Sequence, residues 1–365
     1  MLRSSGTGAL VSSPFARFVC CAALVVSPAC QREPNVTRLE AADPTIQETL
    51  KVAPINEDLS PRLLRRFAPI QGAPTGRDTA LVHLGRILFF EPLLSRTGKV
   101  SCNSCHPLDR YGTTATRFSA GVDGKQGRRN APTVYNTAGH TSLFWDGRAA
   151  GLAAQALGPL SNPAEMDMKP GSIIRVLQAV PGYRPLFERA FPGEAQPMSI
   201  GNVSAALAEF ERGLMTPGRW DQYLEGEKQA LSPPEKEGVR LFANLGCMVC
   251  HAGAYIGGTM FEKLGIYAPW PNQTDHGRRD VTHNPADDMV FKVPSLRNVA
   301  RTTPYFHDGS VASLDTAVRM MAHHQLGVDL MDEEARSIVA WLGSLTGDIP
   351  RDYIATPVLP AANRP

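Results

Sequence analysis

The pentapeptide Cys-X-X-Cys-His occurs twice in this chain of 365 residues, at 102–106 and at 247–251. Two thiols at this spacing can form thioether links to the vinyl groups of a porphyrin, and the adjoining histidine can bind its iron. A structural zinc site or a redox dithiol is the alternative, but a zinc site needs four ligands gathered locally. The doubled motif therefore predicts two covalently bound c-type haems. The residues that hold them would be Cys102, Cys105 and His106 for the first haem, and Cys247, Cys250 and His251 for the second.

The first thirty residues contain the three remaining cysteines and have the pattern of a secretory signal peptide. Basic residues precede the apolar run Phe18–Val26, which is far shorter than the roughly 20 residues that span a bilayer. Ala29 before Cys30 also fits lipoprotein processing with Cys30 as the lipidated residue, and both forms of export stay open. Because c-type haems are attached outside the bacterial cytoplasm, the sequence predicts a protein of the bacterial periplasm, soluble or lipid-anchored.

An internal repeat precedes the two haem motifs. Gly85 and Phe89 stand before the first motif with the same spacing as Gly238 and Phe242 before the second. Both pairs fit one face of the helix that begins a small cytochrome c, and Ser232 followed by two prolines marks the start of the second such helix. No long alternating strand pattern occurs. We therefore predict a mainly α fold with two cytochrome c-like haem domains and extensive irregular loops, which the 32 glycines and 30 prolines favour.

Length and composition agree with two domains. A hydrophobic content of 43% describes an ordinary globular protein, and a net charge of +2 gives no reason to invoke nucleic acid or a membrane surface. We expect a signal peptide (1–30), a linker or N-terminal segment (31–60), a first haem domain (61–227), a second haem domain (228–346) and a proline-rich C-terminal tail (347–365).

Further motifs lie between and after the two haem motifs. They occupy residues 130–136, 144–149, 155–159, 162–166, 293–298 and 304–309. Together these motifs closely resemble the bacterial di-haem cytochrome c peroxidase family over about residues 84–345, nearly all of the chain after the leader. Relatives of that family include the di-haem enzyme that matures the tryptophan-derived quinone of methylamine dehydrogenase. The resemblance implies an oxidoreductase that reduces hydrogen peroxide to water with electrons from a small cytochrome c or cupredoxin, and it is compatible with a homodimer.

The resemblance assigns peroxide chemistry to the first haem. Glu165 matches the family's catalytic acid and base, and Gln155 matches the glutamine that orients peroxide beside it. A solvated carboxylate is the alternative for Glu165, because most glutamates lie at the surface. Trp145 matches the tryptophan between the two haems, where it can conduct electrons, pack in the core, or do both.

The resemblance gives the second haem an electron-storing role. Met321 stands fourteen residues after His307, as the family's ligand methionine does, and would bind the iron opposite His251. A His/Met ligand pair raises the potential of a haem. Helical spacing alone would make Met321 an ordinary core residue, and its neighbour Met320 stays an alternative ligand. His307 itself is expected to have a structural or propionate-side role.

The resemblance also implies a calcium ion between the domains. Asn130, Thr302 and Pro304 match its ligands, Asn130 through its side-chain oxygen and the other two through backbone carbonyls. Such an oxygen ligand set suits a hard cation.

The chain departs from the best-known family members at one place. Many members carry a histidine that blocks the peroxidatic iron until the other haem is reduced, whereas residues 118–130 hold no histidine and Val122 occupies the matching position. We therefore expect an open first haem, with His140 as the only candidate for a replacement gate.

Two other function classes stay open. The first is a di-haem oxidase that modifies a partner protein through Trp145, although the relative with that activity has a tyrosine where Met321 stands here. The second is a di-haem electron-transfer cytochrome, which would not need Glu165 and Gln155 beside an open iron.

Overall fold

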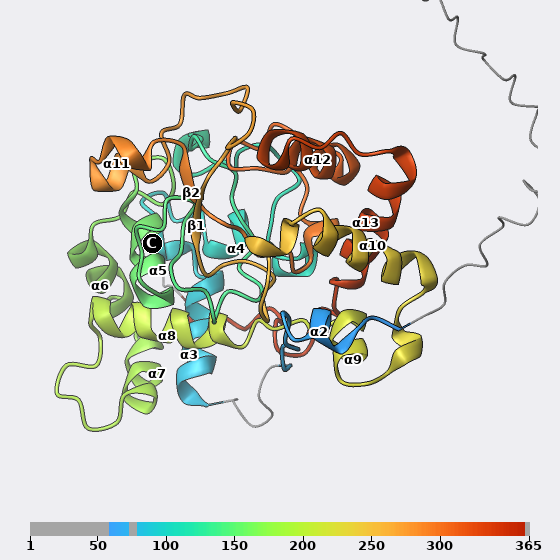
Figure 1. Cartoon of the computed structure of the whole chain (residues 1–365). Coiled ribbons are helices and arrows are strands. Elements are labelled where there is room, and N and C mark those ends of the chain that lie inside the picture. Colours follow the sequence, from blue (N-terminus) through green and yellow to red (C-terminus); the bar gives the residue numbers. More distant parts are fainter. Residues whose placement is uncertain (1–57, 73–78, 362–365) are drawn as a thin grey trace, which may run out of the picture. The chain divides into compact units, whose positions relative to one another are not determined.

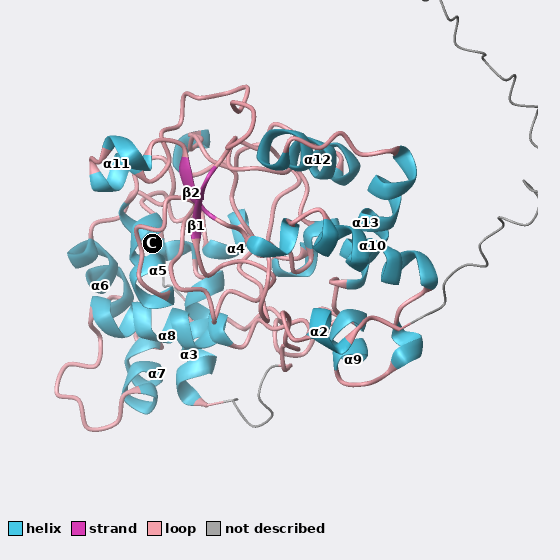
Figure 2. Cartoon of the chain, viewed as in Figure 1, coloured by secondary structure: helices cyan, strands magenta, loops and turns pink. Residues whose placement is uncertain are grey.

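The computed structural model describes residues 58–72 and 79–361, and within these ranges the chain is mostly helix and loop (Figures 1 and 2). The only strands there, β1 (Phe261–Lys263) and β2 (Val290–Lys292), pair antiparallel with Phe261 opposite Lys292. The prediction of a mainly α fold is confirmed. The predicted signal peptide with Cys30 lies outside the described residues, as does most of the predicted linker.

Short and medium helices alternate with long loops along the chain (Figure 1). The α-helices are α2 (Pro61–Leu64), α3 (Ala80–Phe90), α4 (Cys102–Cys105), α5 (Leu152–Ser161), α6 (Pro170–Gln178), α7 (Tyr183–Ala190), α8 (Ile200–Arg212), α9 (Arg219–Leu224), α10 (Pro233–Asn244), α11 (Arg279–Thr282), α12 (Leu314–Met321) and α13 (Asp332–Ser344).

Local sequence determines where two of the longer helices begin. At the start of α8 the hydroxyl oxygen of Ser199 accepts a hydrogen bond from the backbone N–H of Asn202 at 3.2 Å. At the start of α10 the backbone N–H of Ser232 donates to the Glu235 carboxylate at 2.8 Å, and two prolines fill the first turn. These contacts satisfy amide groups that the first turn of a helix leaves without partners. The predicted helix start after Ser232 is confirmed.

The helices form two separate apolar cores. The first contains Phe89 of α3, Tyr183 of α7 and Phe210 of α8, and the second contains residues of α10 and α13. Figure 1 shows α3, α6, α7 and α8 grouped on one side of the described region and α10, α12 and α13 on the other. Phe67 and Trp220 pack in the second core, although both precede the boundary expected at residue 227. The division into two haem domains stays a prediction.

The described part of the C-terminal tail packs against the first core. Ile354 is buried there, and the Tyr353 hydroxyl donates a hydrogen bond to the backbone oxygen of Phe210 at 2.7 Å. The two rings also stack, with their centroids 5.2 Å apart. The tail therefore connects the end of the chain to α8, on the opposite side of the fold from α13.

The glycines of the internal repeat lie at two equivalent helix crossings. A Cβ atom on Gly85 of α3 would lie 2.0 Å from the backbone oxygen of Ala206 in α8. A Cβ atom on Gly238 of α10 would lie 2.0 Å from the backbone oxygen of Ser337 in α13. Only glycine allows backbones to approach this closely. The sequence repeat is therefore a repeat of structure, in which α3 crosses α8 as α10 crosses α13.

Substitution of a crossing glycine tests this packing. Gly238→Ala should lower the free energy of unfolding by about 1–3 kcal/mol, the usual cost of overpacking, because backbone atoms cannot move aside as a side chain can. Gly343→Ala on α13 is the control, since its Cβ would meet no atom within 4 Å. Thermal unfolding of the haem-loaded protein measures both variants. Equal stability of the two variants would show that the crossing tolerates a methyl group.

Candidate haem sites

The histidines of the two motifs are held in the same way. His106 follows α4, and its Nδ1 lies 3.0 Å from the backbone oxygen of Gly112. His251 follows the short helical turn η5 (Cys247–Val249), and its Nδ1 lies 3.2 Å from the backbone oxygen of Ile256. A ring that donates from Nδ1 to a carbonyl keeps Nε2 as the atom that can bind a metal.

Burial keeps both of these rings neutral. It lowers the pKa of His106, and it lowers the pKa of His251 to about 4. Neutral imidazole is the form that binds a metal, because the protonated ring has no free lone pair. Both histidines are therefore ready to act as iron ligands at neutral pH.

Each haem motif lies at its own cavity. The smaller cavity is lined by Cys102, Cys105 and His106. The larger cavity is lined by Cys247, Cys250 and His251. None of these four cysteines forms a disulfide. Two free thiols and a neutral imidazole at each cavity are the donors that a covalent haem requires, so the residues present fit the group that the sequence predicts.

Glu165 and Gln155 lie at the smaller cavity together with the first motif. Gln155 is part of α5, and Glu165 follows that helix in a loop whose Asn162 donates a hydrogen bond to the Glu165 carboxylate at 2.6 Å. Burial raises the pKa of Glu165, although the bond from Asn162 opposes this. A carboxyl group with a raised pKa can exchange protons closer to neutral pH than a solvated one. The Glu165 side chain is thus partly buried at a cavity and is not fully solvated.

The segment at the gating position packs directly against Glu165. The backbone N–H of Val122 donates to the backbone oxygen of Glu165 at 2.8 Å, and the Val122 side chain is fully buried. At Gly121 a Cβ atom would lie 2.2 Å from the backbone oxygen of Ala164, so only glycine fits there. This segment holds the Glu165 loop and supplies no side chain that could bind iron.

His140 lies away from the first cavity. Its Nδ1 is 3.4 Å from the ammonium nitrogen of Lys292, and its ring meets Tyr255 edge-on with centroids 5.5 Å apart. Among the described histidines, only His106 lines the smaller cavity. His140 is therefore not placed to block the iron of the first haem, as the gating histidine of other family members does.

Met321 lies at the larger cavity with His251. It is the last residue of α12, which continues into the π-helical turn η8 (Ala322–Leu326). Met320 points elsewhere and packs in a separate apolar cluster around Trp270. His323 and His324, which follow, are not among the residues that line the cavity. Of these neighbours, only Met321 is placed at the same cavity as the second haem motif.

Trp145 and the three predicted calcium ligands also lie at the larger cavity. Asn130, Thr302 and Pro304 line it together with Trp145. The indole N–H of Trp145 donates to the backbone oxygen of Asn130 at 2.9 Å, and the Asn130 side-chain amide donates to two backbone oxygens of residues 116 and 117. The described residues contain no group of three or more His, Cys, Asp or Glu placed to hold a metal ion.

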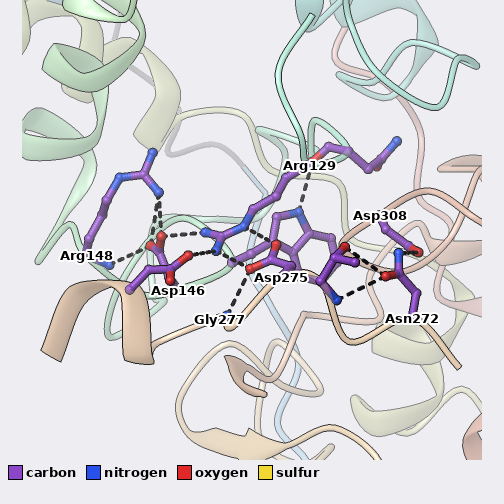
Figure 3. Close-up of polar contacts among 11 residues, drawn as sticks. Arg129, Asp146, Arg148, Asn272, Asp275, Gly277 and Asp308 are labelled. Atoms are coloured by element: carbon purple, nitrogen blue, oxygen red, sulfur yellow. Dashed lines mark hydrogen bonds and ion pairs between the residues drawn. The ribbon is translucent and has the colours of Figure 1, made fainter. Parts of the chain in front are cut away.

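An ion-pair network holds the loops that carry Asn130 and Trp145 (Figure 3). Arg129 donates to both oxygens of Asp275 at 2.6 Å and to Asp146 at 2.5 Å. Asp146 accepts a second guanidinium from Arg148 at 2.8 Å. These acids and hydrogen bonds outweigh burial and raise the pKa of Arg129, so the cation is permanent. Since Arg129 precedes Asn130 and Asp146 follows Trp145, the network sets the position of both residues.

Sequence reasoning gave no role to several charged residues that line the cavities, including one buried residue at each cavity. Glu211 of α8 lies at the smaller cavity and Lys292 of β2 at the larger one. Their exposed fractions are only 5% and 8%, and burial lowers the pKa of Lys292 to about 8. One signal could have revealed Glu211, since it is a charged residue inside the apolar stripe of its helix. His307 is also buried at the larger cavity, and neither of its ring nitrogens has a hydrogen-bond partner among the described residues.

No helix in the described ranges is long and apolar enough to cross a membrane.

Several known proteins are similar to this chain in sequence or structure. The profile of the family described as di-haem cytochrome c peroxidase matches residues 79–229. A cytochrome c551 peroxidase of Nitrosomonas europaea is 44% identical over 81% of this chain and 88% of its own. A cytochrome c551 peroxidase of Pseudomonas aeruginosa is 40% identical over 76% of this chain and 82% of its own. The crystal structure of a MauG-like protein associated with microbial copper homeostasis matches with a TM-score of 0.69 at 30% identity, over 82% of this chain and 98% of that one.

Covalent attachment at both cavities can be measured by mass spectrometry of the denatured protein. The wild-type chain should carry the mass of two haems, and replacement of both cysteines of either motif by serine should leave one. The two double variants, at 102 and 105 or at 247 and 250, serve as controls for each other. A variant that retains two haems, or a wild-type chain with none, would contradict the assignment of the motifs.

Proposed function

Because the chain belongs to the di-haem cytochrome c peroxidase family, we propose that it reduces hydrogen peroxide to water at the smaller cavity. Two electrons and two protons convert one peroxide to two waters, and a small periplasmic cytochrome c or cupredoxin is the electron donor. The observation that supports this most strongly is the presence of Glu165 and Gln155 at the same cavity as the first haem motif. A group that moves protons and a group that orients a polar substrate are what peroxide cleavage requires of the protein.

The residues of the smaller cavity have separate roles in this reaction. When bound there, a haem supplies the one-electron chemistry and a free coordination position for peroxide. Glu165 takes a proton from one oxygen of the peroxide and donates it to the other oxygen, which leaves as water. The Gln155 amide holds the peroxide beside that carboxylate. Asn162 fixes the direction of the carboxylate through its hydrogen bond.

In this proposal, electrons from the donor protein enter at the larger cavity. His251 and Met321 line this cavity and would hold the iron of a haem bound there, and a thioether ligand would favour its ferrous form. Trp145 also lines this cavity and would be the conduit for electrons that leave it toward the first site. The two haems belong to two cytochrome c-like domains, and the two apolar cores with equivalent helix crossings support this division.

We also propose a calcium ion at Asn130, Thr302 and Pro304. Support comes from their shared place at the larger cavity and from the Asn130 side chain. Its amide hydrogens are directed to backbone oxygens of residues 116 and 117, which leaves its oxygen available to a cation. An amide oxygen and backbone carbonyls are hard ligands of the kind that calcium prefers.

We propose that the protein acts in the bacterial periplasm. Export by a signal peptide supports this, with or without a lipid on Cys30, as does the requirement of c-type haem for attachment outside the cytoplasm. A homodimer is the assembly that we propose by analogy with the family.

A di-haem oxidase of a partner protein is the second candidate. The similarity to a MauG-like protein favours it. Met321 at the larger cavity opposes it, since the relative that matures methylamine dehydrogenase has tyrosine at this place. An electron-transfer cytochrome is the third candidate, and Glu165 and Gln155 at the smaller cavity oppose it.

Replacement of Glu165 tests the proposed acid and base. Glu165→Gln keeps the shape of the side chain and removes its proton exchange, so peroxide cleavage should slow by about 10²–10⁴-fold. The wild-type rate should fall as pH drops through the raised pKa of Glu165, because the base must be ionised, and the variant should lose this dependence. Stopped-flow absorbance with peroxide measures both.

Glu188→Gln on the exposed face of α7 is the matched control and should leave the rate unchanged. A Glu165→Gln rate within a factor of about two of wild type, well short of the loss expected for a general base, would show that this carboxylate takes no part.

The absent gate predicts activity without prior reduction. With buried Val122 beside the Glu165 loop and His140 against Lys292, no described histidine other than His106 lines the first cavity. Fully oxidised protein should therefore react with peroxide as fast as protein reduced by one electron, and His140→Ala should change neither rate. Activity that appears only after reduction would reveal a gate that this structure does not contain.

A further inference from the structure

Glu211 is a buried carboxyl group without a partner at the first cavity. It lies near the end of α8, is 5% exposed, and shares the cavity with Cys102 and Glu165. No described residue donates a hydrogen bond to its carboxylate or forms an ion pair with it. Desolvation alone raises the pKa of Glu211 to about 8. A buried charge without a partner costs the fold stability, so this position needs an explanation.

The structural repeat shows which residue an ordinary core would have here. The crossing of α3 and α8 at Ala206 corresponds to the crossing of α10 and α13 at Ser337. Five residues further along each helix, Glu211 corresponds to Leu342. Both residues line a cavity, Glu211 the smaller and Leu342 the larger. The same position therefore carries an apolar side chain at the second haem site and an acid at the first.

No cation of the described residues pairs with Glu211. Around the cavity the titratable groups are Cys102, Cys105, His106 and Glu165, none of which is a fixed positive charge. The packed helix α5 carries no charged residue. Of the cations on the other helices that pack against α8, Arg86 of α3 is directed to backbone oxygens of residues 352 and 353, and Arg175 of α6 to the Ser172 hydroxyl. His83 of α3 lies beside Arg86. The remaining source of positive charge for Glu211 is the group that binds in the cavity.

We propose that Glu211 balances the positive charge of the first haem: its carboxylate stabilises the ferric iron, lowers the potential of this haem relative to the second, and couples its reduction to uptake of one proton. In that step one electron from the donor protein goes to the iron, and one proton from solvent goes to the Glu211 carboxylate. Net charge around the iron then stays constant, which the low dielectric of the cavity favours. This inference rests on the proposed binding of a haem at the smaller cavity and not on peroxide turnover.

Redox titration of the haem-loaded protein at a series of acidic, neutral and alkaline pH values, followed by visible spectroscopy, tests the proposal. The potential of the first haem in the wild-type protein should fall with rising pH, approaching about 59 mV for each tenfold drop in proton concentration, as for one proton and one electron. Glu211→Gln should raise this potential and remove most of the pH dependence. The potential of the second haem should be unchanged, because Leu342 stands at the equivalent position.

Two further variants separate charge from packing. Glu211→Leu, which copies the residue of the second repeat, should behave as Glu211→Gln does, although its shape differs. Glu165→Gln removes the other carboxyl of the cavity and should retain the pH dependence. A wild-type potential and slope in both Glu211 variants would overturn the proposal, as would loss of the first haem from both, since Glu211 would then serve attachment. A wild-type chain that binds no first haem would instead refute the proposed function.

Discussion

Two close helix crossings support the rest of this structure. Gly85 lets α3 approach the backbone of α8, and Gly238 lets α10 approach the backbone of α13 in the same way. Each crossing helix precedes a Cys-X-X-Cys-His motif along the chain, and residues of the helix that it crosses line the same cavity as that motif. The cavities therefore have a common framework, and their chemistry differs only through the side chains that the framework carries.

The difference between the cavities is large. The first carries two carboxyl groups and an amide, from Glu165, Glu211 and Gln155. The second is lined by Met321 and Leu342 and also by charged side chains such as Glu262 and Lys292, with the ion pair of Arg129 nearby. A thioether ligand closes an iron and raises its potential, whereas acids beside an open iron move protons and lower its potential. In our proposal, the first site performs the chemistry and the second site stores electrons.

The structural features that the sequence could predict are local ones. The haem motifs are contiguous, and the helix start at Ser232 depends on its next three residues, so both can be recognised without a fold. Met321 and Met320 are neighbours on one helix, and only packing shows which of them reaches the cavity. The Arg129–Asp275 pair joins residues 146 positions apart, and nothing local indicates it. Phe67 and Trp220 join the second core for the same reason, since long-range packing overrides order along the chain.

We propose that the repeat holds one open haem and one haem closed by Met321. Electron paramagnetic resonance and magnetic circular dichroism of the fully oxidised, haem-loaded protein test it most directly, because they report spin state and axial ligands for each haem. We expect one high-spin haem with a free or water-filled sixth position and one low-spin haem with histidine and methionine ligands. Two low-spin haems, or two high-spin haems, would contradict it.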